Sequence, residues 1–144
     1  VLLEQKGLMA ALSRYSNERL RPLGVAVQLS GGGCAPDLPE EVKLTLYRIG
    51  QESLSNVARH AAARNVSLDL RCTGAELVLT VRDDGRGFDA AEVSQDGGAL
   101  RGVGLLGVQE RVWLLDGKVT MAPTPGGGAV IDVRIPYTGE CRTV

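Results

Sequence analysis

Apolar residues recur at three- and four-residue steps in three stretches of the chain, a spacing that lines one side of a helix. The stretches are Leu2–Leu20, the segment from Pro39 or Glu40 to about Ala62, and the segment from Val103 to about Gly117. Pro22 follows the first stretch and Gly117 closes the third, as is common beyond a helix end. The pattern therefore predicts three helices.

In five other stretches apolar and polar residues alternate, as they do in half-buried strands. These are Val25–Leu29, Val66–Leu70, Leu77–Val81, Lys118–Ala122 and Ala129–Ile135. Thr73-Gly74 joins the second to the third, which predicts an antiparallel hairpin, and a glycine-rich turn joins the last two. The order of elements predicts an α/β (α+β) two-layer sandwich, with a mixed, mostly antiparallel sheet of about five strands and three main helices on one face.

Length and charge are those of one soluble domain. The 144 residues fit a single domain, residues 1–144, whose core we place at about residues 22–137, after an N-terminal helix in residues 1–21. The formal net charge of -1 predicts no contact with nucleic acid or with an anionic membrane. No apolar run approaches the roughly 20 residues of a membrane span, and the first residues lack the layout of a signal peptide.

Two sets of residues are assigned to packing. Cys34, Cys72 and Cys141 are odd in number and far apart, which predicts neither a disulfide framework nor a paired zinc site. With so few cysteines, the cytoplasm is the location that we expect. Trp113–Leu115 has the helical spacing of residues that pack in a core.

One side of the long predicted helix carries a row of polar residues. At about 100° per residue, Arg48, Glu52, Asn56 and Arg59 fall along one strip beside the apolar strip. A carboxylate four residues before a carboxamide offers oxygen ligands to a hard cation such as magnesium, directly or through water. Arg59 and His60 can then meet phosphates. Taken alone, the row is more typical of a solvated helix face with side-chain pairs four residues apart.

A second polar segment, Val81–Phe88, runs from a strand into two carboxylates and two glycines. At the strand end, Asp83 can accept a hydrogen bond from an exocyclic amine, as adenine presents, and Gly85 and Gly87 let the backbone pass close to a ring. Taken alone, the same residues predict an ordinary Asp-Gly turn. The alternating oxygen ligands of a calcium loop are absent from this segment.

Two glycine-rich segments follow. Gly102-Val103-Gly104-Leu105 leads into a helix and offers backbone N–H groups, with the positive end of the helix dipole, to a phosphate. It follows no strand, so it does not fit a Rossmann fingerprint. Gly126-Gly127-Gly128 is compatible with a loose hairpin or with a close approach of the backbone to a nucleotide. Residues from about 89 to 101 lack periodicity, which predicts a mobile loop.

In combination, the order of these segments resembles the N, G1, G2 and G3 boxes of the ATPase superfamily shared by histidine kinases, DNA gyrase and heat-shock chaperones. The resemblance covers about residues 40–136. Leu46–Ala61 is similar to the N box of nitrate-sensor-type histidine kinases, and Gly104–Val112 is similar to the segment after the lid in those kinases. The resemblance implies a histidine-kinase ATPase-like fold, with residues 89–101 as the ATP lid.

The same resemblance implies roles for the site residues. Asn56 would coordinate Mg²⁺, Glu52 would orient a metal-bound water or act as the catalytic base, and Asp83 would bind the adenine amine. Residues expected to contact or frame ATP are Asn56, Arg59, His60, Asp83, Gly85, Gly87, Gly102, Val103, Gly104, Leu105 and Gly128. Ala129 stands where the family usually has Thr, and Asp84 where Asn is frequent, so we expect an effect on nucleotide affinity or base selectivity.

The resemblance further implies ATP and Mg²⁺ as cofactors and transfer of the γ-phosphoryl group to a histidine. His60 is the only histidine of the sequence and lies inside the N box. We therefore expect the acceptor on a dimerisation domain before Val1, with a response regulator acting through that domain, in a kinase that is membrane-anchored or soluble. Two alternatives stay open: an anti-sigma-factor-like serine kinase, and a degenerate nucleotide-sensing interaction module, which Ala129 favours.

Overall fold

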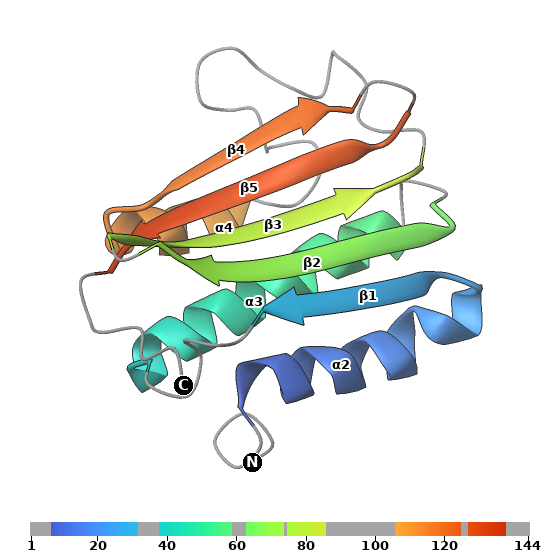
Figure 1. Cartoon of the computed structure of the whole chain (residues 1–144), viewed down its shortest axis with the longest axis horizontal. Coiled ribbons are helices and arrows are strands. Elements are labelled where there is room, and N and C mark those ends of the chain that lie inside the picture. The colour runs from blue at the N-terminus through green and yellow to red at the C-terminus, as the bar shows by residue number, and fades with distance from the viewer. Residues whose placement is uncertain are drawn as a thin grey trace.

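The computed structural model describes residues 7–31, 38–58, 63–73, 75–85, 106–124 and 127–137. The helical elements are α2 (Leu8–Arg19), the short 3-10 helix η1 (Arg21–Leu23), α3 (Glu40–Asn56) and α4 (Leu106–Leu114). The strands are β1 (Ala26–Gly31), β2 (Asn65–Cys72), β3 (Glu76–Asp83), β4 (Lys118–Pro123) and β5 (Ala129–Pro136). They form the predicted two-layer arrangement, in which α2, α3 and α4 lie on one side of the sheet (Figure 1).

The five strands form one sheet in the order β1-β2-β3-β5-β4. β1 runs parallel to β2, and the other described pairs are antiparallel, so the predicted mixed and mostly antiparallel sheet is confirmed. β5 rather than β4 lies beside β3, and their register sets Asp83 opposite Ala129. The ends of α3 and β3 and the turn between β4 and β5 therefore meet at one end of the domain (Figure 1).

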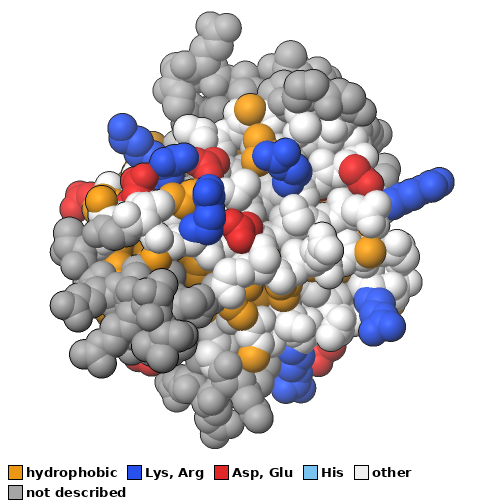
Figure 2. Space-filling model, in the orientation of Figure 1, with side chains coloured by type: hydrophobic (Ala, Val, Ile, Leu, Met, Phe, Trp, Pro, Cys, Tyr) orange, Lys and Arg blue, Asp and Glu red, His pale blue; other side chains and the backbone are white. Residues whose placement is uncertain are grey.

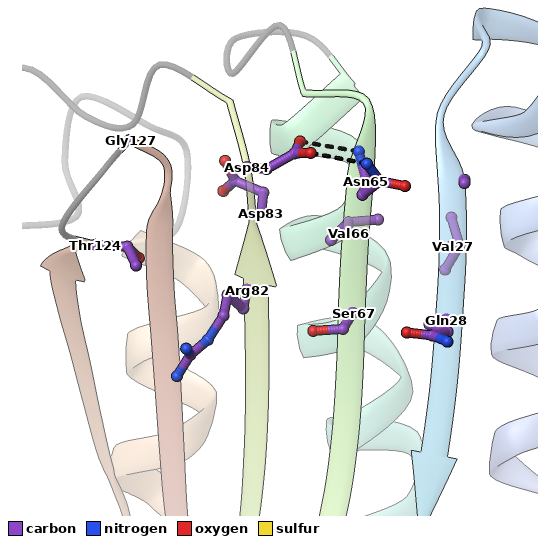
Figure 3. A pocket seen from close by; sticks show the side chains of 11 residues that line it. Val27, Gln28, Asn65, Val66, Ser67, Arg82, Asp83, Asp84, Thr124 and Gly127 are labelled. Carbon is purple, nitrogen blue, oxygen red and sulfur yellow. Dashed lines mark hydrogen bonds between the residues drawn. The ribbon is translucent and has the colours of Figure 1, made fainter.

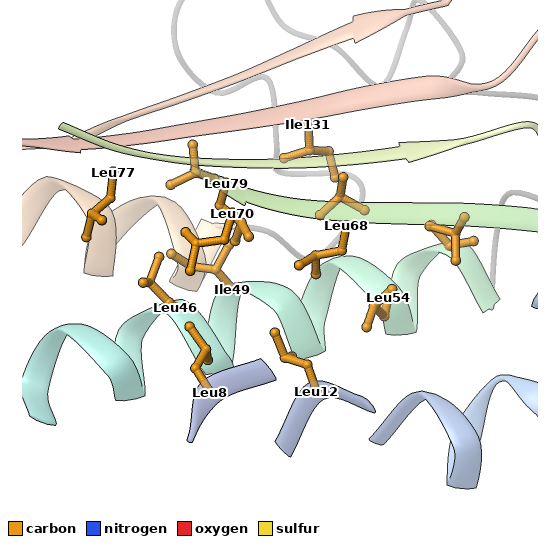
Figure 4. Packing of buried hydrophobic residues seen from close by; sticks show 14 of the residues in the cluster. Leu8, Leu12, Leu46, Ile49, Leu54, Leu68, Leu70, Leu77, Leu79 and Ile131 are labelled. Carbon is orange, nitrogen blue, oxygen red and sulfur yellow. The ribbon is translucent and has the colours of Figure 1, made fainter. Parts of the chain in front are cut away.

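Alternation along the strands gives the sheet a buried face and an open face. On β3, Leu77, Leu79 and Val81 are at most 2% exposed and join the core that also contains Leu46 and Ile49 of α3 (Figure 4). Burying one such side chain stabilises the fold by roughly 1.5–3 kcal/mol. The core thus holds α3 against the sheet and includes Leu54 of its last turn.

A glycine permits the close approach of α2 to α3. A Cβ atom added at Gly50 would lie 2.8 Å from Leu12 Cδ2 and 3.3 Å from Leu68 Cδ1. Leu12 and Leu68 are themselves fully buried. Gly50 therefore lets α2 lie close across α3 and lets α3 lie close to Leu68 of β2.

The open face of the sheet is polar (Figure 2). Arg134 of β5 bonds Asp132 at 2.8 Å and Glu76 of β3 at 2.9 Å, and Arg71 pairs with Asp69 on β2 at 3.1 Å. Of these pairs only Arg134–Glu76 joins two strands. All of them suit a solvated surface, where each ion pair contributes at most about 1 kcal/mol. The helix-covered face and the open face therefore have different chemistry.

Three expectations fall outside the described residues: the end of the long helix near Ala62, the predicted lid and the start of the third helix at Val103. The α-helical part of α3 ends at Asn56. Among the described residues, no helix is both long and apolar enough to cross a lipid bilayer.

Two packing assignments were wrong. Trp113 is 53% exposed and Leu114 84% exposed, whereas Val112 is fully buried. Val112 and Leu115 are three residues apart and share the inner side of α4, so the two residues between them turn outward. Cys72 on β2 takes part in a disulfide, and the other cysteine of this disulfide lies outside the described residues. The spacing of cysteines along the sequence does not show which of them lie close together in the fold.

Candidate functional site

The polar row of α3 passes from solvent into the interior toward the end of the helix. Arg48 is exposed and donates to Gln51 at 3.4 Å rather than to Glu52. Glu52, one turn later, is half-buried, and Asn56, one further turn along, is only 2% exposed. The row is therefore not a uniformly solvated face, because its last described member is a buried carboxamide.

At the end of β3, Asp83 is a buried carboxylate. It is 6% exposed, and its Oδ1 accepts a hydrogen bond of 2.9 Å from the Gly85 backbone N–H. Burial raises the pKa of Asp83 above its ordinary value, and the negative charge of Asp84 adds to the rise, while the N–H groups of Gly85 and Ala129 oppose it. A carboxylate that burial destabilises gains from any further N–H donor that reaches it.

Gly128 brings the turn between β4 and β5 against this strand end. It has φ +90°, and an added Cβ would lie 2.0 Å from the Asp83 carbonyl oxygen and 3.1 Å from the Asp84 Cα. Both the left-handed backbone and the close approach exclude a side chain here. Gly128 therefore contacts the backbone of Asp83. From its sequence context, Gly128 was expected to lie in a loose hairpin or to approach a nucleotide, and this contact is an additional role.

Asp84 points away from Asp83 and binds the start of β2 (Figure 3). Its Oδ1 accepts from the backbone N–H groups of Arg64 and Asn65, both at 2.9 Å, and its Oδ2 accepts from Asn65 Nδ2 at 2.8 Å. These donors hold the pKa of Asp84 below its ordinary value, the Asn65 side chain most strongly. The expected effect of Asp84 on nucleotide affinity or base selectivity stays a prediction.

The described site residues belong to the ends of α3 and β3 and to the turn before β5, and these meet at one end of the domain (Figure 1). There Asp83 accepts the Gly85 N–H, and Gly128 lies against the backbone of Asp83 and Asp84. Asn56 and Glu52 reach the same end from the last turns of α3. The remaining predicted site residues lie outside the described residues: Arg59, His60, Gly87, Gly102, Val103, Gly104 and Leu105.

A cavity of about 500 Å³ adjoins this end from the other side of the sheet (Figure 3). Gln28, Ser67 and Arg82 line it. Their positions alternate with core positions of β1, β2 and β3, so the cavity opens on the face opposite the helices. Asn56 does not line it. Asp83 and Asp84 also line it, so the cavity reaches the strand end where the predicted adenine contact lies.

Two features of the site were missed by sequence reasoning. One is the support of Asp83 by the Ala129 backbone N–H, which follows from the register of β3 and β5 and needs no particular side chain at position 129. The other is the set of bonds between Asp84 and residues 64 and 65. No local signal predicts either, because both join segments that are separated along the chain.

Residues 41–139 match the model of the family described as histidine kinase-, DNA gyrase B- and HSP90-like ATPases. Over 138 residues the chain is 30% identical to the signal transduction histidine-protein kinase/phosphatase DegS of Brevibacillus brevis, covering 96% of this chain and 34% of that protein. It is 34% identical over 134 residues to the sensor histidine kinase ComP of Bacillus subtilis, covering 93% of this chain and 17% of ComP. The chain thus spans a third or less of the length of these relatives.

Solved structures share the fold at low sequence identity. The blue-light activated histidine kinase EL346 of Erythrobacter litoralis has a TM-score of 0.69 at 23% identity, covering 91% of this chain and 42% of that one. The ATP binding domain of PrrB from Mycobacterium tuberculosis has a TM-score of 0.62 at 20% identity, covering 90% of this chain and 93% of that one. With the family match over most of its length, the chain belongs to the family of histidine kinase-, DNA gyrase B- and HSP90-like ATPases.

Proposed function

We propose that this chain binds Mg-ATP on the helix side of the sheet and donates the γ-phosphoryl group to a histidine of a separate dimerisation domain in a two-component sensor histidine kinase. One observation carries the proposal: the buried carboxylate of Asp83 lies at the same end of the domain as the buried carboxamide of Asn56. Relatives named as histidine kinases support the direction of transfer. A response regulator would receive the group from that domain, in the cytoplasm.

The base of ATP would bind at the strand end. An ionised Asp83 is an acceptor-only group, which matches the N–H donors of the adenine amine. Its raised pKa means that burial disfavours the charge, and a donor from the ligand would restore part of that loss. Gly85, whose N–H already orients the carboxylate, and Gly128 behind it would frame the ring.

The phosphates would lie toward the end of α3. The Asn56 carboxamide and the Glu52 carboxylate are one turn apart and supply oxygen ligands of the kind that Mg²⁺ prefers, while the ion usually keeps several waters. When bound, the ion would neutralise phosphate charge. Arg59, His60 and the Gly102–Leu105 segment stay predictions for further phosphate contacts, and residues 89–101 for the lid.

The contribution of the chain to transfer would be positioning and electrostatic stabilisation. The bond between the γ-phosphorus and the bridging oxygen of ATP breaks, a bond to a ring nitrogen of the acceptor histidine forms, and ADP leaves. Glu52 would organise the metal-bound water or accept a proton. The serine-kinase and nucleotide-sensing alternatives have no relative among those named above to favour them.

Titration of the 144-residue chain with ATP, with and without Mg²⁺, tests the proposal. We expect saturable binding that Mg²⁺ strengthens, and no phosphohistidine on the chain after incubation with labelled ATP. Addition of the helical phosphoacceptor domain of the same kinase should then give acid-labile label on that domain. Absence of ATP binding would favour a degenerate interaction module, and stable label on His60 would contradict a separate acceptor.

In the intact kinase, substitution of Asn56 by Asp is expected to lower autophosphorylation by roughly 100-fold, because a charged group in a buried ligand position changes the metal shell.

Glu52→Gln in the same kinase separates two roles of Glu52. If Glu52 organises the metal shell, the Mg²⁺ concentration for half-maximal activity rises; if it is a base, the rate falls at unchanged Mg²⁺ dependence. Arg48→Gln, on the same helix but exposed, is the matched control. Full activity of Asn56→Asp would exclude Asn56 as a metal ligand.

A further inference from the structure

We propose that Asp84 is a positioning residue of the nucleotide site, holding together the two chain segments that carry its buried polar groups; this inference rests on the proposed function. Asp84 makes hydrogen bonds to Arg64 and Asn65 through its carboxylate, and its own N–H donates to the Asn65 carbonyl at 3.2 Å. The end of β3 and the start of β2 are thus joined in both directions. We call this set of four bonds the Asp84 clamp.

On the β3 side, the clamp acts on the orientation of Asp83. The two carboxylates belong to consecutive residues and point in opposite directions (Figure 3). Asp83 Oδ1 accepts from Gly85, the residue on the other side of Asp84. A peptide unit whose side chain and N–H are both bound to β2 has little freedom to turn, so the clamp fixes the direction in which Asp83 points.

On the β2 side, the clamp acts on the chain that leaves α3. Ala63, next to the bonded Arg64, is 9% exposed and belongs to the core. Residues 59–62 are the only ones between Ala63 and Ala58, the last described residue after α3. Anchoring residues 64 and 65 therefore restricts where the end of α3, with Asn56, lies relative to Asp83.

The clamp differs from an ordinary surface contact in its donors. Asp69, another carboxylate of the sheet, is bound by the side chains of Ser30 at 2.7 Å and Arg71 at 3.1 Å. Asp84 is bound by two consecutive backbone N–H groups. A hydrogen bond from a backbone N–H ties Asp84 to the strand itself, whereas a side-chain donor can rotate away without moving the strand. The lowered pKa of Asp84 agrees with three donors that favour its charged form.

The geometry predicts that Asn, but not Ala, preserves the clamp. In Asp84→Asn the amide oxygen can take the place of Oδ1, which accepts both backbone N–H groups. The amide nitrogen then replaces Oδ2, and the Asn65 side chain can turn over to present its oxygen to it. Asp84→Ala removes all three carboxylate bonds. This explains how both Asp and Asn suit the position.

Mg-ATP binding by the 144-residue chain tests the proposal, with Asp69→Ala as the matched control. We expect Asp84→Ala to raise the Kd roughly tenfold, and Asp84→Asn and Asp69→Ala to raise it less than about twofold. Asp69→Ala is a suitable control because it also removes a hydrogen-bonded carboxylate. A thermal unfolding curve for each variant shows whether a raised Kd comes from lost positioning or from lost folding. Equal Kd values for Asp84→Ala and Asp84→Asn would overturn the proposal.

A second readout needs no nucleotide. Exchange of the Gly85 amide hydrogen, followed by NMR, reports whether Asp83 still accepts from it. We expect faster exchange in Asp84→Ala than in Asp84→Asn, at temperatures where both are folded; equal exchange would overturn the inference. If the unaltered chain binds no ATP, the proposed function fails, and the Gly85 comparison still decides whether Asp84 positions Asp83.

Discussion

Asp83→Asn is expected to weaken ATP binding by at least about 100-fold while leaving the unliganded chain at least as stable at neutral pH. Asn retains one oxygen, whose two lone pairs can accept the N–H groups of both Gly85 and Ala129. It places an NH₂ group where the second carboxylate oxygen stood, so a donor would face the N–H donors of the adenine amine. Isothermal titration of the chain with Mg-ATP measures the loss.

The stability side of this prediction follows from the direction of the pKa shift. Because burial raises the pKa of Asp83 in the folded chain, the folded state binds this proton more readily than the unfolded state. Its contribution to the free energy of unfolding is therefore largest below the ordinary pKa and falls as pH rises through the folded value. Asn does not titrate, so the variant should gain stability relative to the parent between about pH 3 and pH 7.

Urea unfolding at both pH values checks this, with Asp69→Asn on the open face as the control carboxylate. An Asp83→Asn variant that is destabilised at pH 7 and binds ATP normally would contradict both the expected loss of binding and the expected stability. Asp83 would then be a structural carboxylate. The combination of lost binding with retained stability is typical of a residue kept for function at a cost to the fold.

Gly128→Ala is expected to lower the free energy of unfolding by about 3 kcal/mol and to weaken ATP binding in the fraction that folds. The Cβ atom would lie 2.0 Å from the Asp83 carbonyl oxygen, and backbone cannot move aside as a side-chain end can. The turn between β4 and β5 must then separate from β3 and take Ala129, which supports Asp83, with it.

Gly24→Ala separates the two causes of this loss. Gly24 also has a positive φ, +81°, but an added Cβ would have nothing within 4 Å. Its substitution carries only the backbone cost, about 1–2 kcal/mol, and should leave ATP binding intact. Chemical denaturation of both variants measures the difference. Equal losses would mean that strain at φ, rather than contact with Asp83, explains the need for glycine at position 128.

The main elements of the fold could be predicted from local patterns. Alternation of apolar residues in β3 and β5 and the helical repeat of α3 reflect burial on one side of each element, and burial is a property that the order of residues records directly. The strand-end position of Asp83 could be predicted for the same reason. The order of the sheet could not, because insertion of β5 between β3 and β4 depends on contacts between distant segments.

The candidate site, too, could be predicted only in part from local patterns. Spacing along one helix placed Glu52 and Asn56 on one strip, but it did not tell that Arg48 is solvated and Asn56 buried. Helical geometry fixes the angle between residues and leaves open how deep each end of the helix lies. Similarly, Trp113 and Leu114 have helical spacing and yet are exposed, since α4 presents only one side to the core.

The sequence alone determines the order of helices and strands, the polar row of the long helix and the residues that follow the strand end at Asp83. Each of these features depends only on residues that are close together along the chain. Folding decides which of these groups meet. The Asp83 carboxylate gains its raised pKa only when folding buries it. It gains its support from Ala129 and its contact with Gly128 only when β5 pairs with β3. Desolvation and backbone approach are properties of assembled segments, which is why no local pattern records them.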